Sequence, residues 1–259
     1  MMTALLAAIG LLTRVPVRRA FSESEVASAI AFYPLVGAAI GSTQMAGLWV
    51  AAVFLPAQTA IGDGASRVPA GVLAVCLVGL AVWITGALHL DGLADAADGF
   101  GGGRSREEVL TIMRDPRVGA YGAVAIALLL LVKLACLEAL IERRAAMVPL
   151  LAAPIAGRWA MAALGAWLPY ARTDGGLGTV ARGPTGGRGL AVATASSVLL
   201  LVAAGGGRAV AFGAVTAGLT VAAGLACRRR IGGFTGDTLG ATGELTEAAV
   251  LLTAVVIAA

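Results

Sequence analysis

The 259-residue sequence has little charge and few of the residues that bind soft metals. Only 13% of the residues are charged, and the chain has three cysteines and a single histidine. Hydrophobic residues make up 59%, so the chain is not a soluble domain, and we expect no nucleic acid among its partners. Cys76, Cys136 and Cys227 lie in or beside apolar stretches, and we interpret them as buried small hydrophobes without a metal or redox role.

Long apolar runs dominate the sequence and predict its fold. Seven stretches are candidate membrane spans: 29–55, 68–90, 120–140, 145–168, 190–204, 209–227 and 245–259. We therefore predict an all-α, polytopic membrane bundle of about seven helices, forming one membrane-embedded transferase domain over residues 1–259. The apolar segment 1–13 is too short to span; it is expected to lie at the interface or to re-enter the membrane, without a cleavable signal peptide. The 36 glycines are typical of close helix packing in lipid.

Basic residues fall unevenly on alternate loops. The richer set holds thirteen: Arg14, Arg18, Arg19, Arg104, Arg106, Arg114, Arg117, Arg172, Arg182, Arg188, Arg228, Arg229 and Arg230. The opposite set holds four: Arg67, Arg143, Arg144 and Arg208. The positive-inside rule then predicts that the amino terminus and the acidic residues after the second span, with the active site, are cytoplasmic, and that the carboxyl terminus is external. We expect the protein in the cell (inner) membrane.

One motif, His89-Leu-Asp-Gly-Leu-Ala-Asp-Ala-Ala-Asp-Gly99, follows the second predicted span. On an α-helix its three aspartates, Asp91, Asp95 and Asp98, fall within an arc of roughly 60°. Their mutual repulsion favours a hard cation such as Mg²⁺ between them, and we expect them to be catalytic and metal-binding. Gly92 would let a ligand or a neighbouring helix approach the backbone. The alternative is a solvated helix end, which needs no metal.

Arginines follow the motif closely and are typical of phosphate binding. Arg104 lies after a glycine run, and Arg114 and Arg117 flank Asp115 just before the third span. Arginine forks bind phosphate oxygens, while Gly119 and Gly122 would leave the start of the next helix open to an anion. Topology anchoring explains the arginines equally well, but not Asp115.

Further ionisable groups lie in or beside the other spans. Asp237 and Glu244 are seven residues apart and could share a metal site with the aspartates, or, like Glu247, only occupy a helix start. Arg158 is expected to line the site, because an unpaired arginine in mid-span is costly. Lys133 is expected to snorkel or to pair with Glu138. His89 is either a substrate-binding residue or a structural hydrogen-bonder.

Together these residues resemble the cobalamin synthase family of adenosylcobinamide-GDP ribazoletransferases. The matching segments are 12–16, 33–37, 89–99, 112–122, 157–158 and 236–241, with Glu244 following. Two departures from the family pattern are Arg114, where lysine is expected, and Pro116, where serine is usual.

The resemblance implies a Mg²⁺-dependent reaction in the last steps of vitamin B12 assembly. Adenosylcobinamide-GDP would give its adenosylcobinamide-phosphate group to α-ribazole or α-ribazole 5′-phosphate and release GMP. The implied metal ligands are Asp91, Asp95, Asp98 and Glu244. The implied substrate-binding residues are His89, Arg104, Arg114, Asp115, Arg117, Arg158 and Asp237. The resemblance does not determine whether the protein forms a homo-oligomer.

Two other functions compete with this interpretation. The run Asp91-Gly-Leu-Ala-Asp95 is similar to the acidic motif of CDP-alcohol phosphatidyltransferases, but Asp95 and Ala96 replace that family's alanine and arginine. An ion-coupled transporter would instead carry its carboxylates near the bilayer midplane in repeated halves, whereas the sequence shows no internal repeat.

Overall fold

The computed structural model describes residues 1–54, 68–172 and 186–258, so Arg67 and Arg182 lie outside the described residues. Within these ranges the regular structure consists of helices. They are α1 (Met2–Leu12), α2 (Glu23–Ala29), the 3₁₀-helix η1 (Ile30–Phe32), α3 (Tyr33–Phe54), α4 (Ala70–Thr85), α5 (Leu88–Gly102), α6 (Arg106–Ile112), α7 (Ala120–Glu142), α8 (Met147–Trp167), α9 (Gly186–Gly205), α10 (Arg208–Ile231) and α11 (Gly236–Ile257).

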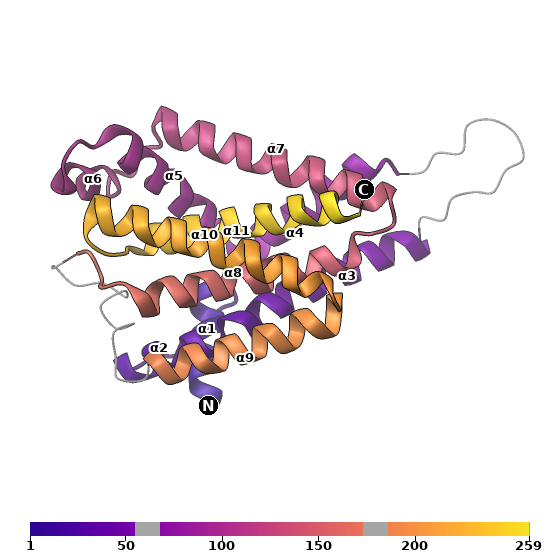
Figure 1. The fold of residues 1–259 in the computed structure, drawn as a ribbon, viewed down its shortest axis with the longest axis horizontal. Helices are drawn as coiled ribbons and strands as arrows, with labels where there is room; N and C mark the ends of the chain where they lie inside the picture. Colours follow the sequence, from indigo (N-terminus) through magenta and orange to yellow (C-terminus); the bar gives the residue numbers. More distant parts are fainter. Residues whose placement is uncertain (55–67, 173–185, 259) are drawn as a thin grey trace, which may run out of the picture.

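The helices confirm the predicted polytopic bundle. In the described part of the chain, six are long and apolar enough to cross a membrane, and α4 with α5 makes a seventh if the bent pair counts as one span. One predicted span is wrong in shape: residues 68–90 do not form a continuous helix, because α4 ends at Thr85 and α5 leaves it at 89°. The aspartate motif therefore lies on a separate helix, across the direction of α4 (Figure 1).

Helix α8 is the centre of the bundle and packs closely through glycines. A Cβ at Gly41 of α3 would lie 2.6 Å from the backbone oxygen of Leu150 in α8. On the other side of α8, a Cβ at Gly157 would lie 2.8 Å from the backbone oxygen of Gly243 in α11. Only glycine allows backbones this close, so the expected role of small residues in helix packing is confirmed.

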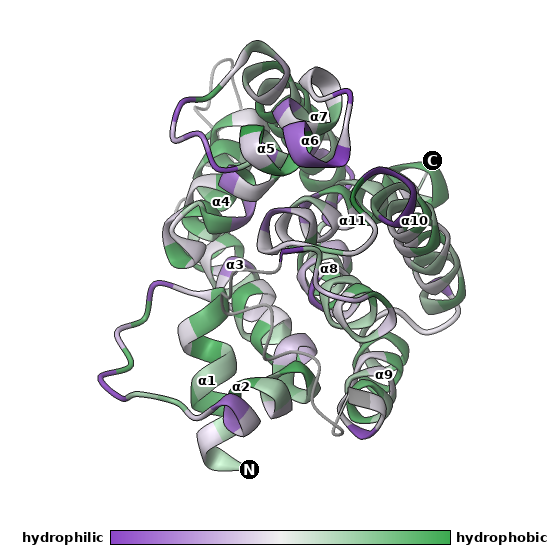
Figure 2. Ribbon diagram, turned by 90° about the vertical axis from the view of Figure 1, so that its left-hand side faces the viewer, coloured by the Kyte–Doolittle hydropathy of each residue, from purple (hydrophilic) through white to green (hydrophobic). Residues whose placement is uncertain are grey.

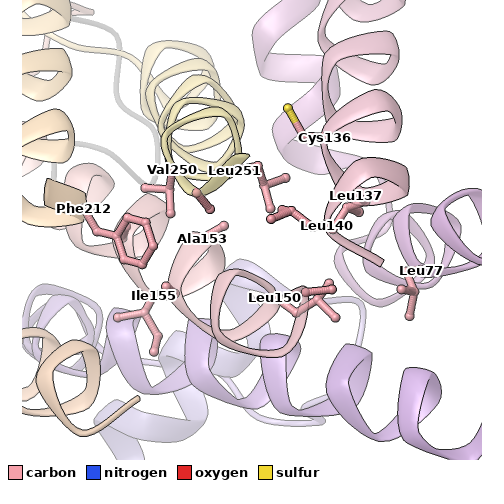
Figure 3. Close-up of a cluster of buried hydrophobic side chains, with 14 of the residues drawn as sticks. Leu77, Cys136, Leu137, Leu140, Leu150, Ala153, Ile155, Phe212, Val250 and Leu251 are labelled. Atoms are coloured by element: carbon pink, nitrogen blue, oxygen red, sulfur yellow. The ribbon is translucent and has the colours of Figure 1, made fainter. Parts of the chain in front are cut away.

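The largest apolar core lies between α7, α8, α10 and α11. Leu140, Ile155, Phe212 and Val250 are almost fully buried there (Figure 3). Each of these helices thus buries one apolar stripe against α8 and its neighbours, which fixes their rotation. Cys136 and Cys227 are buried as predicted, whereas Cys76 is exposed, which corrects that part of the expectation.

The amino-terminal segment is a short helix packed against one side of the bundle. Ala7, Ala8 and Leu12 of α1 are buried in a cluster with Ile30 and Tyr33. At eleven residues α1 is too short to span a bilayer, as the sequence indicates, and its buried face joins it to η1 and the start of α3.

The two ends of the bundle differ in polarity. Figure 1 places α6, the end of α10 and the start of α11 at one end, and the α7–α8 turn and the carboxyl terminus at the other. Seen from the first end, the polar ribbon is concentrated on α6 and the end of α10, while the flanks of the spans are apolar (Figure 2). The described arginines of the richer set therefore gather at the end that carries the aspartate motif.

Candidate active site

Two residues with left-handed backbone create the turn between α4 and α5. Gly86 has φ 64° and Ala87 has φ 61°. Glycine adopts this conformation freely, whereas alanine there costs roughly 1 kcal/mol. The N–H of Ala87 donates to the carbonyl of Val82 over 3.0 Å, which closes α4, and the carbonyl of Ala87 then accepts from Asp91 and opens α5. The turn aims the aspartate motif toward α11.

Helices α5 and α11 cross in contact at a pair of glycines. A Cβ at Gly92 would lie 2.9 Å from the backbone oxygen of Asp237, and a Cβ at Gly240 would lie 3.1 Å from Cα of His89. The close approach predicted for Gly92 is thus made by a neighbouring helix. Asp91 and Asp237 are 146 positions apart in the sequence. The crossing brings Asp237 next to Asp91 and the rest of the aspartate motif.

The crossing gathers an excess of negative charge, which we call the surface acid cluster: Asp91, Asp95 and Asp237, with Arg172. Asp91 is exposed and Asp95 is half-buried, and the charge of Asp95 is opposed by both other carboxylates. Arg172 donates to Asp237 over 2.8 Å and is the one described cation paired within the cluster. Three carboxylates face one guanidinium, so the cluster attracts a further cation.

A backbone bridge between two loops holds Arg172 in place. The N–H of Ala171 donates to the carbonyl of Phe234, and the N–H of Phe234 donates to the carbonyl of Pro169, both over 2.8 Å. The rings of Tyr170 and Phe234 pack edge to face, with centroids 5.5 Å apart. In the sequence Arg172 indicates only topology, because nothing local marks it as the partner of Asp237.

Asp98 is positioned for a different task from the other two aspartates of the motif. Its side chain is buried, and its two oxygens accept from the backbone N–H groups of Gly119, over 2.7 Å, and Gly122, over 2.9 Å. These N–H groups open α7, so Asp98 caps that helix from α5. The anion expected at Gly119 and Gly122 is therefore a carboxylate of the protein and not a substrate phosphate. We assign Asp98 to this cap and keep Asp91 and Asp95 as the accessible pair.

A second group of charges is sealed in the bundle, which we call the buried ion cluster: Lys133, Arg158, Glu244 and Glu247. Lys133 Nζ donates to Glu244 and, over 2.7 Å, to Glu247. Arg158 donates to the other oxygen of Glu247. Two cations balance two carboxylates here, and all four side chains are buried.

The buried ion cluster corrects three expectations. Arg158 is not unpaired, Lys133 pairs across the bundle and not with Glu138, and Glu244 is neutralised by Lys133. Glu244 therefore does not join the aspartates as a metal ligand in this arrangement. Among the described carboxylates of α11, Asp237 is the one that lies beside the aspartate motif. Spacing along the chain shows none of this, because Lys133 and Glu244 are 111 residues apart.

The arginines expected to bind phosphate divide into two groups. Arg104 and Arg114 are exposed at the rim near α6, with substrate roles that stay predictions. Arg117 forms a bidentate pair with Asp115, over 2.9 and 2.7 Å, which lowers the pKa of that carboxyl to about 2 and keeps it ionised. By contrast Arg106, at the start of α6, donates to the carbonyl of Ile231 at the end of α10 and to the carbonyl of Ala171 in the loop after α8. It therefore holds these segments together.

His89 is buried at the crossing without a partner. It is 2% exposed, and neither ring nitrogen has a hydrogen bond to any described residue. The structural hydrogen-bonder considered from the sequence would need such a partner. A buried imidazole without one is costly, which favours the substrate-binding alternative.

The surface acid cluster suits a hard divalent ion that is shared with a substrate. Within the described ranges, no three His, Cys, Asp or Glu side chains converge closely enough to hold a metal by themselves. Mg²⁺ in phosphate chemistry usually takes one or two carboxylates and completes its shell with water and phosphate oxygens. Asp91 and Asp95 offer such carboxylates, and their oxygens are the right donor type.

The fold and site define a polytopic helical membrane protein with an accessible acidic site at its arginine-rich end. A family model described as cobalamin-5-phosphate synthase matches residues 4–255. The chain belongs to this family, which makes it a transferase of cobalamin biosynthesis and confirms the resemblance of its motifs.

Curated relatives agree over nearly the whole chain. The adenosylcobinamide-GDP ribazoletransferase of Syntrophobacter fumaroxidans is 41% identical over 236 residues, covering 90% of this chain and 88% of that protein. The protein of the same name from Chlorobaculum tepidum is 40% identical, covering 98% and 95%. No solved structure matches the chain.

Proposed function

We propose that the protein transfers the adenosylcobinamide-phosphate group of adenosylcobinamide-GDP to α-ribazole or α-ribazole 5′-phosphate, releasing GMP, with Mg²⁺ as cofactor. The observation that carries the proposal is the surface acid cluster, in which Arg172 pairs with Asp237 while Asp91 and Asp95 add two further negative charges beside that pair. Two of the relatives that match almost the full chain are named for this transfer.

Different residues of the chain would bind the metal, bind the phosphate and attract the substrate. Asp91 and Asp95 would hold Mg²⁺, which when bound supplies charge neutralisation for the diphosphate. Arg172 is oriented by Asp237, and its Nε has no partner among the described residues, which leaves that N–H for a phosphate oxygen. The rim arginines Arg104 and Arg114 add positive charge around the entrance.

The proposed reaction is a substitution at phosphorus. The oxygen of a ribose hydroxyl forms a bond to the phosphorus that carries the cobinamide, and the P–O bond to GMP breaks. The hydroxyl proton passes to a carboxylate of the surface acid cluster, and GMP leaves with the electron pair of the broken bond. Catalysis then consists of alignment and charge stabilisation.

The test is GMP release by protein purified in detergent. We expect release from adenosylcobinamide-GDP only when a ribazole and Mg²⁺ are both present, and none after chelation with EDTA. Release without ribazole would indicate hydrolysis, and release that persists in EDTA would contradict the metal. A mock preparation from cells lacking the chain is the control.

We also propose that the site faces the cytoplasm across the inner membrane. The basis is the accumulation of arginines at the end that carries α6 and the surface acid cluster. A reporter enzyme fused after Ala259 should then behave as periplasmic. A cytoplasmic signal would contradict the seven-span topology.

A further inference from the structure

A cavity lies beside the surface acid cluster, where α1, the start of α3, α5, α8 and α11 meet. Its volume is about 240 Å³. Its walls are mostly apolar or aromatic, with Leu11, Tyr33, Met161 and Phe234 among them. This is close to the lower end of the roughly 300–1,000 Å³ typical of sites for drug-sized ligands, so it suits one planar ring system.

His89 is the polar side chain that marks this cavity as a binding site. It lines the cavity, and both of its ring nitrogens are buried and unpartnered within the described residues. An imidazole in this state gains free energy from a hydrogen bond to a ligand or a water that enters beside it. Asp91 and Asp237 line the same cavity, so a group held here is adjacent to the surface acid cluster.

We propose that the cavity holds the aromatic base of the acceptor ribazole, with His89 donating a hydrogen bond to the free ring nitrogen of that base. This assignment rests on the proposed function and adds a subsite to it. The base sits among Leu11, Tyr33 and Phe234, which directs the attached ribose toward Asp91 and Asp237.

The chemistry of the walls selects among the parts of the two substrates. Guanine presents several donors and acceptors along its edge, and the apolar walls would leave most of them unsatisfied. The corrin ring is far too large for 240 Å³. A ribazole base is a fused, largely apolar ring with one free nitrogen, which matches an apolar cavity with one buried imidazole.

The test is the selectivity of a kinetic defect in His89→Leu. This variant keeps an apolar side chain of moderate size and loses both ring nitrogens. We expect the KM for α-ribazole to rise about tenfold, the value of one lost hydrogen bond, while the KM for adenosylcobinamide-GDP changes by less than about twofold. Ser197→Ala is the matched control, because Ser197 is also buried and unpartnered but does not line this cavity, and it should change neither constant.

A second variant keeps the test independent of how His89→Leu folds. Leu11 is only half-buried on α1, and Leu11→Trp narrows the cavity from that wall. It should also raise the KM for α-ribazole alone. A rise in the KM for adenosylcobinamide-GDP instead, or unchanged constants in both variants, would overturn the assignment while the wild type still releases GMP. A wild type that releases no GMP would overturn the proposed function and this subsite together.

Discussion

The surface acid cluster and the buried ion cluster are built from similar residues, and α11 contributes to both. The buried one sets two cations against two carboxylates, all shielded from solvent. The surface one sets Arg172 against three carboxylates, with Asp91 exposed. Removing one partner from a balanced, buried cluster destabilises the fold, whereas an excess of negative charge that solvent can reach suits a bound cation. Balance and access, more than residue type, separate the two roles.

The sharpest test of the comparison removes negative charge from the surface acid cluster. Asp91→Asn and Asp95→Asn keep side-chain size but lose the charge that attracts Mg²⁺. We expect each to lower the rate of GMP release about a thousandfold, roughly 4 kcal/mol of transition-state stabilisation, with little change in thermal unfolding. Rates are measured against Mg²⁺ concentration and normalised to folded protein. Wild-type rates with the same Mg²⁺ dependence in both variants would contradict the metal assignment.

Breaking the buried ion cluster should lower the stability of the protein and not its turnover per folded molecule, the opposite of the aspartate variants. Lys133→Met leaves Glu244 and Glu247 facing only Arg158, and we expect the free energy of unfolding to fall by about 3 kcal/mol. Adding Glu244→Gln restores the balance and should recover most of this loss. Thermal unfolding in detergent measures both variants. If Lys133→Met instead loses turnover per folded molecule at full stability, the cluster takes part in the reaction.

The glycine crossing between α5 and α11 links the two regions. Gly92→Ala places a Cβ against the backbone of Asp237 and forces the helices apart. We expect a loss of about 2 kcal/mol in stability and about tenfold in rate, because Asp91 and Asp237 separate. Gly213→Ala is the matched control, since nothing lies within 4 Å of that position. Equal behaviour of the two variants would show that the crossing tolerates a methyl group.

The smallest expected effect concerns Asp98, which is next to the surface acid cluster but acts as a cap. Asp98→Asn keeps one acceptor oxygen for the start of α7 and loses the charge. We expect about 1 kcal/mol less stability and an unchanged Mg²⁺ dependence of GMP release. A shifted Mg²⁺ dependence would return Asp98 to the metal site, as its place in the motif first suggested.

The sequence predicts those parts of the structure that local patterns determine. Hydropathy locates the spans, and the spacing of Asp91 and Asp95 marks an acidic helix face. The break at Gly86 and Ala87 could not be predicted, because Ala87 carries no signal for a left-handed backbone inside an apolar run. Partners far apart in the chain, such as Arg172 with Asp237, depend on how helices pack, which periodicity does not encode.

Three contacts tie α5, α7 and α11 into a closed ring, in which each helix holds the next. Asp98 of α5 holds the start of α7, Lys133 of α7 holds Glu244 of α11, and α11 crosses α5 at Gly92. Of these helices α11 leaves the ribosome last. Without α11, Lys133 and Arg158 lose the two carboxylates that they contact in the fold, and unpaired cations are costly in lipid. The same helix therefore balances both cations and places Asp237 beside the motif, so the packing of α11 couples the stability of the bundle to the assembly of its site.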